Sequence, residues 1–218
     1  MNKGQRILAL CLFLGTMFWT ATARADVVAI GQGAFPGGST LITFTGLADG
    51  TEVNGLTVSG VSFTYSLGNG NLIIDGGPGP TNNIAPPNIV SVGNNTGILT
   101  VHLGGLANQF GYGYAILSTI NVANATTITL FNGATNVGSL SYNGIPDPAF
   151  AGGFAGIQST LLFDTVQLTF NSVAAPAFAI DNIRIATAVP EPTSMVLFGS
   201  ALAFLATRIR KRRNHKGD

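Results

Sequence analysis

Short segments in which apolar and polar residues alternate place the strongest constraint on the fold of this 218-residue chain. Alternation with a period of two is typical of strands that bury one face. It is clearest in TLITFTG (40–46), GVSFTYS (60–66), GILTVHL (97–103), TTITLFN (126–132) and DTVQLTFN (164–171). No amphipathic helix of ordinary length interrupts these segments, so the sequence predicts an all-β protein.

Turn-forming dipeptides separate the alternating segments. Asn-Gly and Asp-Gly pairs can enter the φ > 0 region that tight hairpins require. They occur at Asp49-Gly50, Asn54-Gly55, Asp75-Gly76, Asn132-Gly133 and Asn143-Gly144. Roughly eleven short strands with turns every 8–12 residues predict one jelly-roll-like β-sandwich over residues 26–188.

The segment DGGPGPTNNIAPPN (75–88) is rich in Pro, Gly and Asn. An interdomain linker is one interpretation, but the flanking strands are too few to build two cores. We therefore expect a long loop within a single domain. A loop at the end of a sandwich is also well placed for ligand contacts.

The first 25 residues have the organisation of a secretory signal peptide. Lys3 and Arg6 precede the apolar run ILALCLFLGTMFW, and Ala23-Arg24-Ala25 fits the small-x-small cleavage pattern. Cleavage there leaves Asp26 as the first mature residue. Ala21-Thr22-Ala23 is an alternative cleavage site, and an uncleaved membrane anchor is the alternative to cleavage.

Cys11 is the only cysteine of the chain and lies inside that apolar run. Leu10 precedes it, where a lipoprotein signal would need a small residue. The mature protein is therefore predicted to have no disulfide and no thiol chemistry, and to depend on its core for stability.

Basic residues are concentrated at the two ends of the chain. From Asp26 to Glu191 there are eight acidic residues and a single basic residue, Arg184. Phosphate binding needs clustered Lys and Arg, so no nucleic-acid partner is expected.

Indications of catalysis are sparse. His102 is the only histidine before the C-terminal tail, and it alternates with Val101 and Leu103 as an outward-facing strand residue would. There is no nucleophile elbow and no Gly-rich loop leading into a helix. A carboxylate pair of the glycosidase kind is the remaining alternative, and we predict that the protein is not an enzyme.

Two acidic segments are candidates for a calcium site. Asp49 and Glu52 lie in LADGTEV, and Asp181 lies in FAIDNIRI, an otherwise apolar strand. Carboxylate oxygens are preferred calcium ligands, and an unpaired buried carboxylate is unfavourable. The alternative is that Asp181 accepts hydrogen bonds from the backbone of a neighbouring loop. Structural calcium is the only cofactor that the sequence suggests.

The C-terminal residues have the organisation of a membrane anchor. Residues 193–207, TSMVLFGSALAFLAT, would span about 22 Å as a helix, against a bilayer core of about 30 Å. Snorkelling arginines and local thinning of the bilayer can make up the difference. A soluble amphipathic helix is the alternative, but the run has no polar stripe. The basic residues that follow are Arg208, Arg210, Lys211, Arg212 and Arg213.

The positive-inside rule keeps this basic cluster in the cytoplasm and the body of the protein outside. Pro190, Glu191 and Pro192 directly precede the apolar run. In this order, over residues 189–213, the triplet, the apolar run and the Arg-rich end resemble the C-terminal sorting domain of bacterial PEP-CTERM proteins.

That resemblance implies export in a Gram-negative bacterium that makes extracellular polysaccharide. It implies the export machinery and an exosortase, a membrane cysteine protease, as partners. The C-terminal helix would hold the exported protein at the inner membrane before its delivery to the cell surface or the exterior.

The body also resembles the β-sandwich region of such proteins and lectin-like, carbohydrate-binding jelly rolls. The resemblance lies in FTGLADGTEVNGLTVSGVSFTY (44–65) and in the segments FAGIQSTLLFDTVQLTF and AFAIDNIRIA within 154–186. It implies either a displayed surface or matrix component associated with polysaccharide, or a carbohydrate-binding module.

Aromatic residues are the candidates for sugar contacts, and Trp19 leaves with the signal. The mature tyrosines are Tyr65, Tyr112, Tyr114 and Tyr142. FGYGY (110–114) is the best candidate segment. The alternative is that these residues belong to the core, because Phe and Tyr are common in buried strands.

Overall fold

The computed structural model describes residues 26–186, which we call the body. The body has one short 3-10 helix, Gln32–Ala34, and is otherwise built of strands and loops. The strands are β1 (Val27–Ala29), β2 (Thr40–Ile42), β3 (Thr57–Val58), β4 (Val61–Tyr65), β5 (Leu72–Asp75), β6 (Asn88–Ser91), β7 (Leu99–Ile116), β8 (Val122–Asn132), β9 (Thr135–Pro146), β10 (Ala151–Phe170) and β11 (Phe178–Ala186). The prediction of an all-β protein is confirmed for these residues.

The predicted signal peptide (1–25) and the predicted sorting segment (189–213) lie outside the described residues. Between residues 26 and 186 there is no helix long and apolar enough to cross a membrane.

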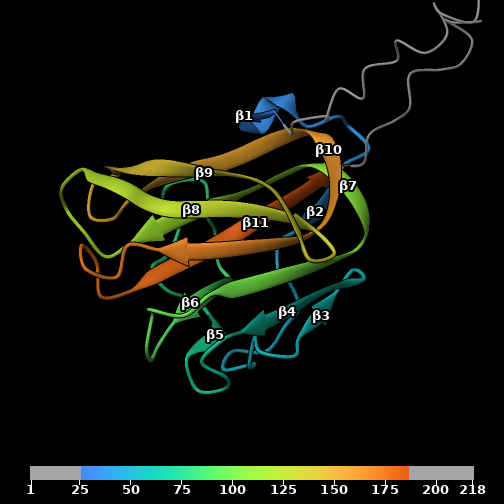
Figure 1. The fold of residues 1–218 in the computed structure, drawn as a ribbon. Coiled ribbons are helices and arrows are strands. Elements are labelled where there is room, and N and C mark those ends of the chain that lie inside the picture. The colour runs from blue at the N-terminus through green and yellow to red at the C-terminus, as the bar shows by residue number, and fades with distance from the viewer. Residues whose placement is uncertain (1–25, 187–218) are drawn as a thin grey trace, which may run out of the picture.

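All the strands belong to one hydrogen-bonded sheet that folds over on itself into two layers (Figure 1). The main strand order is β5-β6-β11-β7-β10-β8-β9, and all the pairs given by their registers are antiparallel. β7 and β10 run through both layers. Residues 109–116 of β7 pair with β11 and with the first half of β10, whereas residues 99–102 pair with β4 and with the last part of β10.

Bends let β7 and β10 pass from one layer to the other. The register of β10 against β7 shifts between Gln158 and Thr165, and β7 contains Gly104, with a φ of +70°, at the corresponding place. Strands that change layers need bulges or bends of this kind. The sequence predicted only short strands, and the 18 residues of β7 and 20 residues of β10 correct that expectation.

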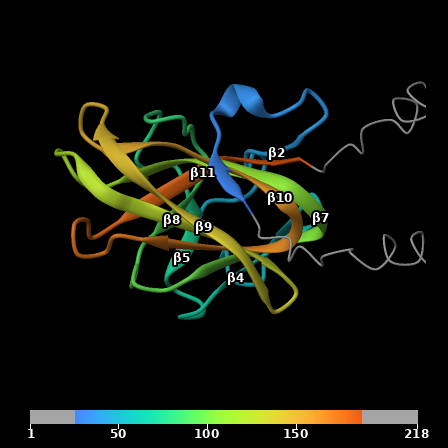
Figure 2. The same cartoon turned by 45° about the horizontal axis from the view of Figure 1, so that its top comes forward.

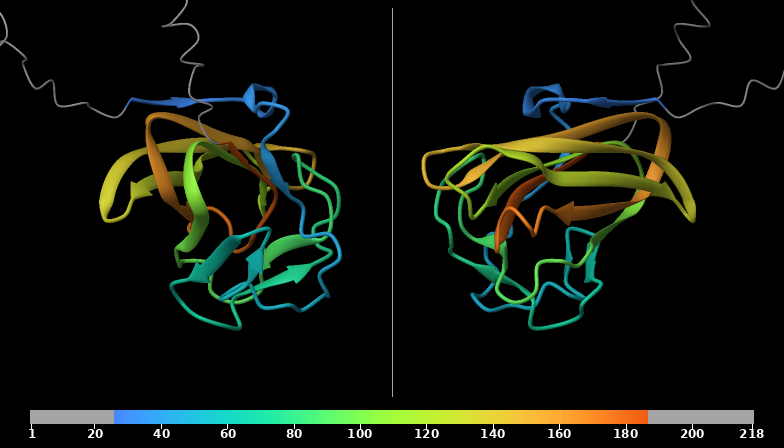
Figure 3. Two further views of the ribbon diagram at one scale, coloured as in Figure 1. Left: turned by 90° about the vertical axis from the view of Figure 1, so that its right-hand side faces the viewer. Right: turned by 60° about the vertical axis from the view of Figure 1, so that its left-hand side comes forward.

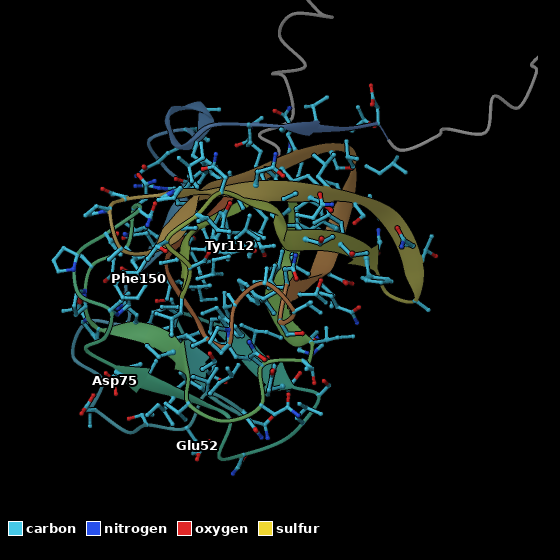
Figure 4. All side chains as sticks on the ribbon, turned by 90° about the vertical axis from the view of Figure 1, so that its left-hand side faces the viewer. Glu52, Asp75, Tyr112 and Phe150 are labelled. Atoms are coloured by element: carbon cyan, nitrogen blue, oxygen red, sulfur yellow. The ribbon has the colours of Figure 1, made fainter. Side chains whose placement is uncertain are left out.

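One apolar core lies between the layers. Phe110, Tyr112 and Tyr114 of β7 point into it and are almost completely buried. The ring of Tyr112 packs on Phe170 of β10 at a centroid distance of 6.4 Å, and its hydroxyl hydrogen-bonds to Thr126 of β8. These contacts join the opposing layers, and Figure 4 shows Tyr112 inside the body. Removing such aromatic surface from water is the main stabilising contribution of the core.

Residues 76–87 form the loop that connects the paired strands β5 and β6, as the loop interpretation of this segment predicted. Within it, residues 81–86 fold back over the outer face of β7 and β11, and we call them the cover segment. A Cβ atom at Gly113 of β7 would overlap the carbonyl oxygen of Asn83. Only glycine therefore permits this close approach of the cover segment to the sheet.

One predicted turn is wrong. Asn143-Gly144 lies inside β9 and does not form a hairpin. Gly144 is buried, and a Cβ atom there would lie 3.2–3.3 Å from atoms of Ala125 and Ala151. The glycine serves tight packing between strands, which a local Asn-Gly pattern cannot distinguish from a turn.

The body has two ends that matter for function. β11 begins at Phe178, at what we call the distal end, and finishes at Ala186, at what we call the terminal end, about 26 Å away at about 3.3 Å per residue. β1 also begins at the terminal end, where Val27 pairs with Ser159. Figures 2 and 3 show the start of β1 and the finish of β11 on the same side of the body.

Candidate functional site

Most carboxylates of the body hold backbone amides in turns and loops. Each of five accepts a hydrogen bond from a main-chain N–H at 2.8–3.2 Å: Glu52 from Gly70, Asp75 from Gly77, Asp147 from Asn82, Asp164 from Gly133 and Asp181 from Ala85. Carboxylates bonded in this way stabilise the backbone around them. None of these bonds resembles the arrangement of an acid and a base about a substrate.

The three residues predicted as calcium ligands are not brought together. Asp49 lies in an exposed turn, and Glu52 forms an isolated bridge with Ile73 of β5. Asp181 lies in β11, and β6 separates that strand from β5. Within residues 26–186, no three His, Cys, Asp or Glu side chains gather into a group that could hold a metal ion.

Asp181 is 1% exposed, and its Oδ2 accepts the amide hydrogen of Ala85 in the cover segment at 3.1 Å. This contact is the loop hydrogen bond that the sequence offered as the alternative to calcium. Burial raises the pKa of Asp181 to about 6, and the nearby backbone amides of Asn182 and Ala85 partly oppose that rise. The other carboxylate oxygen, Oδ1, has no hydrogen-bond partner.

Asp75, Asn88 and Asp181 form a polar row across three neighbouring strands. Asp75 pairs with Asn88 in the β5–β6 register. Ile180 pairs with Ile89 in the core, so the next residues along, Asp181 and Asn88, share the outer face. The sequence pattern indicates Asp181 but not Asp75 or Asn88, since only the order of the strands brings the three residues together.

An apolar pocket of about 220 Å³ adjoins this row at the distal end. Its floor is the next row of the same face, where Ala179 pairs with both Val90 and Ala115. Its walls are Gly77 and Pro78 of the loop, Phe150 of the β9–β10 turn, Leu117, Ala177 and Phe178. Figure 4 looks onto the distal end and shows Phe150 and Asp75 near the edge of the body in that view.

Hydrogen bonds hold the pocket walls in place. The Gly77 amide donates to Asp75 Oδ1 at 2.8 Å, and Asn88 Nδ2 donates to the Gly77 carbonyl at 2.9 Å. On the other side, Asn82 Nδ2 donates to the carbonyl of Phe150 at 2.7 Å. The polar row and the cover segment therefore support both walls of the pocket.

The tyrosines belong to the structure of the body, as the alternative interpretation of FGYGY held. The hydroxyls of Tyr65, Tyr114 and Tyr142 donate to the backbone carbonyls of Asn94, Asn143 and Gly156. Burial raises the pKa of Tyr112 strongly and that of Tyr114 to about 12. His102 is exposed on β7 between Ser62 and Thr165, which confirms its prediction as an outward-facing strand residue.

Its fold and site place the body in the class of all-β domains that have one core, with a small apolar pocket at the distal end. Residues 188–213 of the chain match the family model of the PEP-CTERM protein-sorting motif. The chain thus carries a PEP-CTERM sorting signal, and the resemblance of residues 189–213 to that sorting domain is confirmed. Such a signal implies a surface protein that an exosortase processes.

Solved structures that are similar to the chain include family 29 carbohydrate-binding modules. One matches with a TM-score of 0.35 and 11% identity over 74% of this chain and 88% of the module. A mutant of such a module, complexed with cellulohexaose, matches with a TM-score of 0.35 and 9% identity over 75% of this chain and 92% of that chain. At these scores the likeness carries no conclusion about ligand binding. No curated protein matched the chain.

Proposed function

We propose that this chain is an exported, non-enzymatic surface protein whose body is displayed after exosortase processing and associates with extracellular polysaccharide. The match of residues 188–213 to the sorting motif is the observation that carries the proposal. In this account, residues 1–25 direct export and are removed. Residues 193–207 then hold the protein in the inner membrane as a short helix, with the cluster from Arg208 to Arg213 in the cytoplasm.

The position of the motif supports sorting of the folded protein. β11 ends at Ala186, and three residues separate it from Pro190. At most about 3.6 Å per residue, the body lies within about 14 Å of the triplet. The proline at each side of Glu191 disfavours helix continuation, so the triplet stays accessible outside the bilayer.

Replacement of residues 190–192 by three alanines tests this proposal. We expect the altered protein to remain in the inner-membrane fraction of producing cells, whereas the wild type leaves it. The matched control replaces residues 214–216, which lie beyond the sorting motif. Equal release of both proteins would contradict the proposal.

Carbohydrate binding by a jelly-roll-like body is the second candidate function. The apolar pocket with half-buried Phe150 favours it, because apolar pockets bordered by a few polar groups are typical ligand sites. Phe150 could contact the apolar face of a sugar ring. The pocket lies at the distal end, about 26 Å along β11 from the terminal end. This position would keep the pocket accessible in the anchored protein.

A further inference from the structure

Four buried side-chain atoms of the described residues have no hydrogen-bond partner: Asn88 Oδ1, Gln109 Oε1, Asp181 Oδ1 and Arg184 Nε. Buried polar atoms are nearly always satisfied, so each of these needs an explanation. Gln109 and Arg184 offer an acceptor and a donor. Asn88 and Asp181 offer two acceptors, and they are neighbours in the polar row. While Asp181 is ionised, the two side chains therefore cannot satisfy each other, because only the protonated carboxyl would supply a donor.

The orientation of Asn88 is fixed by its surroundings. Its Nδ2 donates to the Gly77 carbonyl, and a flipped amide would place its oxygen against that carbonyl instead. Oδ1 therefore lies on the opposite side of the amide from Gly77. β5 and β11 flank β6 on its two sides, so Asn88 stands between Asp75 and Asp181. An ion above Asn88 would be within reach of both carboxylates, because neighbouring strands lie about 4.8 Å apart.

The negative charge of Asp181 determines which partner can satisfy both Asn88 Oδ1 and Asp181 Oδ1. A water molecule could donate to both oxygens, but it would leave the charge of a carboxylate that is 1% exposed uncompensated. The only basic residue between the two ends of the chain is Arg184, which lies beyond a break in the β11 register from Asp181. Asp75, in the same row, adds a second negative charge. A cation would compensate the charges of Asp75 and Asp181. It would also give Asn88 Oδ1 and Asp181 Oδ1 the partner that they lack.

We propose that Asp181, Asn88 and Asp75 hold a calcium ion beneath the loop between β5 and β6. Calcium accepts carboxylate, amide and backbone carbonyl oxygens together with water, in six- to eightfold coordination with variable geometry. Magnesium requires near-ideal octahedral geometry and loses its water reluctantly, so it fits a site of two carboxylates and one amide less well. Asp49 and Glu52 take no part.

The calcium ion would also hold the Gly77–Pro78 wall of the apolar pocket in place. Asp75 and Asn88 each hydrogen-bond to Gly77, which with Pro78 forms one wall. Asp181 holds Ala85 of the cover segment. Calcium binding is thus expected to order the segment from residue 76 to 86 and to stabilise the whole body.

The test measures thermal unfolding of the exported protein, purified from producing cells and stripped with a chelator, as free calcium is raised. Binding to the folded state alone raises Tm by about 5–10 °C when calcium exceeds its Kd a hundredfold. Equal concentrations of magnesium should raise Tm much less. Calcium binding itself is followed by isothermal titration calorimetry, which reports the site independently of stability.

Substitutions of single carboxylates test which residues form the calcium site. Asp181→Asn and Asp75→Asn should each abolish or strongly weaken calcium binding and the rise in Tm. Asp164→Asn and Glu52→Gln are matched controls, since these carboxylates bind backbone amides elsewhere in the body. The controls should keep both responses. Identical melting curves in calcium and in chelator, or an undiminished calcium response in Asp181→Asn, would overturn the proposal.

Discussion

The side-chain amide of Asn182 donates a hydrogen bond of 2.8 Å to the carbonyl of Asn83, which lies 99 residues earlier in the chain. Asn182 has a φ of 52° and lies in the irregular part of β11 between Asp181 and Arg184. Asp181 binds Ala85 from the adjacent position. Two consecutive residues of one strand thus hold the cover segment against the sheet.

Gly113→Ala is expected to dislodge the cover segment and to destabilise the protein by about 1–3 kcal/mol. The added Cβ would overlap the Asn83 carbonyl, and overpacking a close contact costs this much. Gly105→Ala, in the same strand but with open space around it, is the control and should change stability little. Urea unfolding measures both. Equal stability of the two variants would show that the cover segment does not pack closely on β7.

In calcium-free buffer, stability is expected to fall as the pH rises from about 4 to about 7. The pKa of Asp181 is about 6 in the folded protein and near 3.8 in the unfolded chain. The folded state therefore binds the proton more tightly, and this contribution is lost as the pH rises through 6. At about 1.4 kcal/mol per pKa unit, the fall is up to about 3 kcal/mol.

Asp181→Asn should remove most of this pH dependence, because the substituted amide does not titrate. Asp75, the other carboxylate of the polar row, is retained in that variant. Urea unfolding at several pH values makes the comparison. If both proteins lose the same stability between pH 4 and 7, the pH dependence does not come from Asp181.

Phe150→Ala is expected to weaken oligosaccharide binding at least tenfold on a glycan array, if the pocket is the sugar site of the second candidate function. The side chain forms one pocket wall and is only half-buried, so Tm should change by a few degrees at most. Phe131→Ala removes another half-buried phenylalanine, outside the pocket, and should leave binding unchanged. Equal binding by both variants would place the sugar contacts elsewhere.

Period-two alternation located the strands that have one buried and one exposed face. It located β2, β4 and β8, and the parts of β7 and β10 near His102 and Thr165. It did not reveal residues 109–116 of β7, because both faces of that half are buried: aromatic side chains face the core, and small residues lie under the cover segment. A strand buried on both faces has no polar alternation to detect.

The candidate site was only partly predictable for a related reason. Asp181 was conspicuous as a carboxylate within an apolar strand. Asp75 and Asn88 lie at the two ends of an irregular loop, where polar residues are ordinary. Their proximity to Asp181 depends on the pairing of β6 with β11, a long-range contact that local sequence does not encode. The sorting motif, by contrast, is a contiguous segment and could be identified from its own residues.

The intact mass of the protein recovered from the cell exterior tests the sorting account most directly. We expect a polypeptide that begins at Asp26 and ends at or close to Pro190-Glu191-Pro192, and so lacks residues 193–218. In a strain without the exosortase, the protein should retain those residues and remain with the inner membrane. Recovery of exterior protein that still carries residues 193–218 from the wild type would contradict the account.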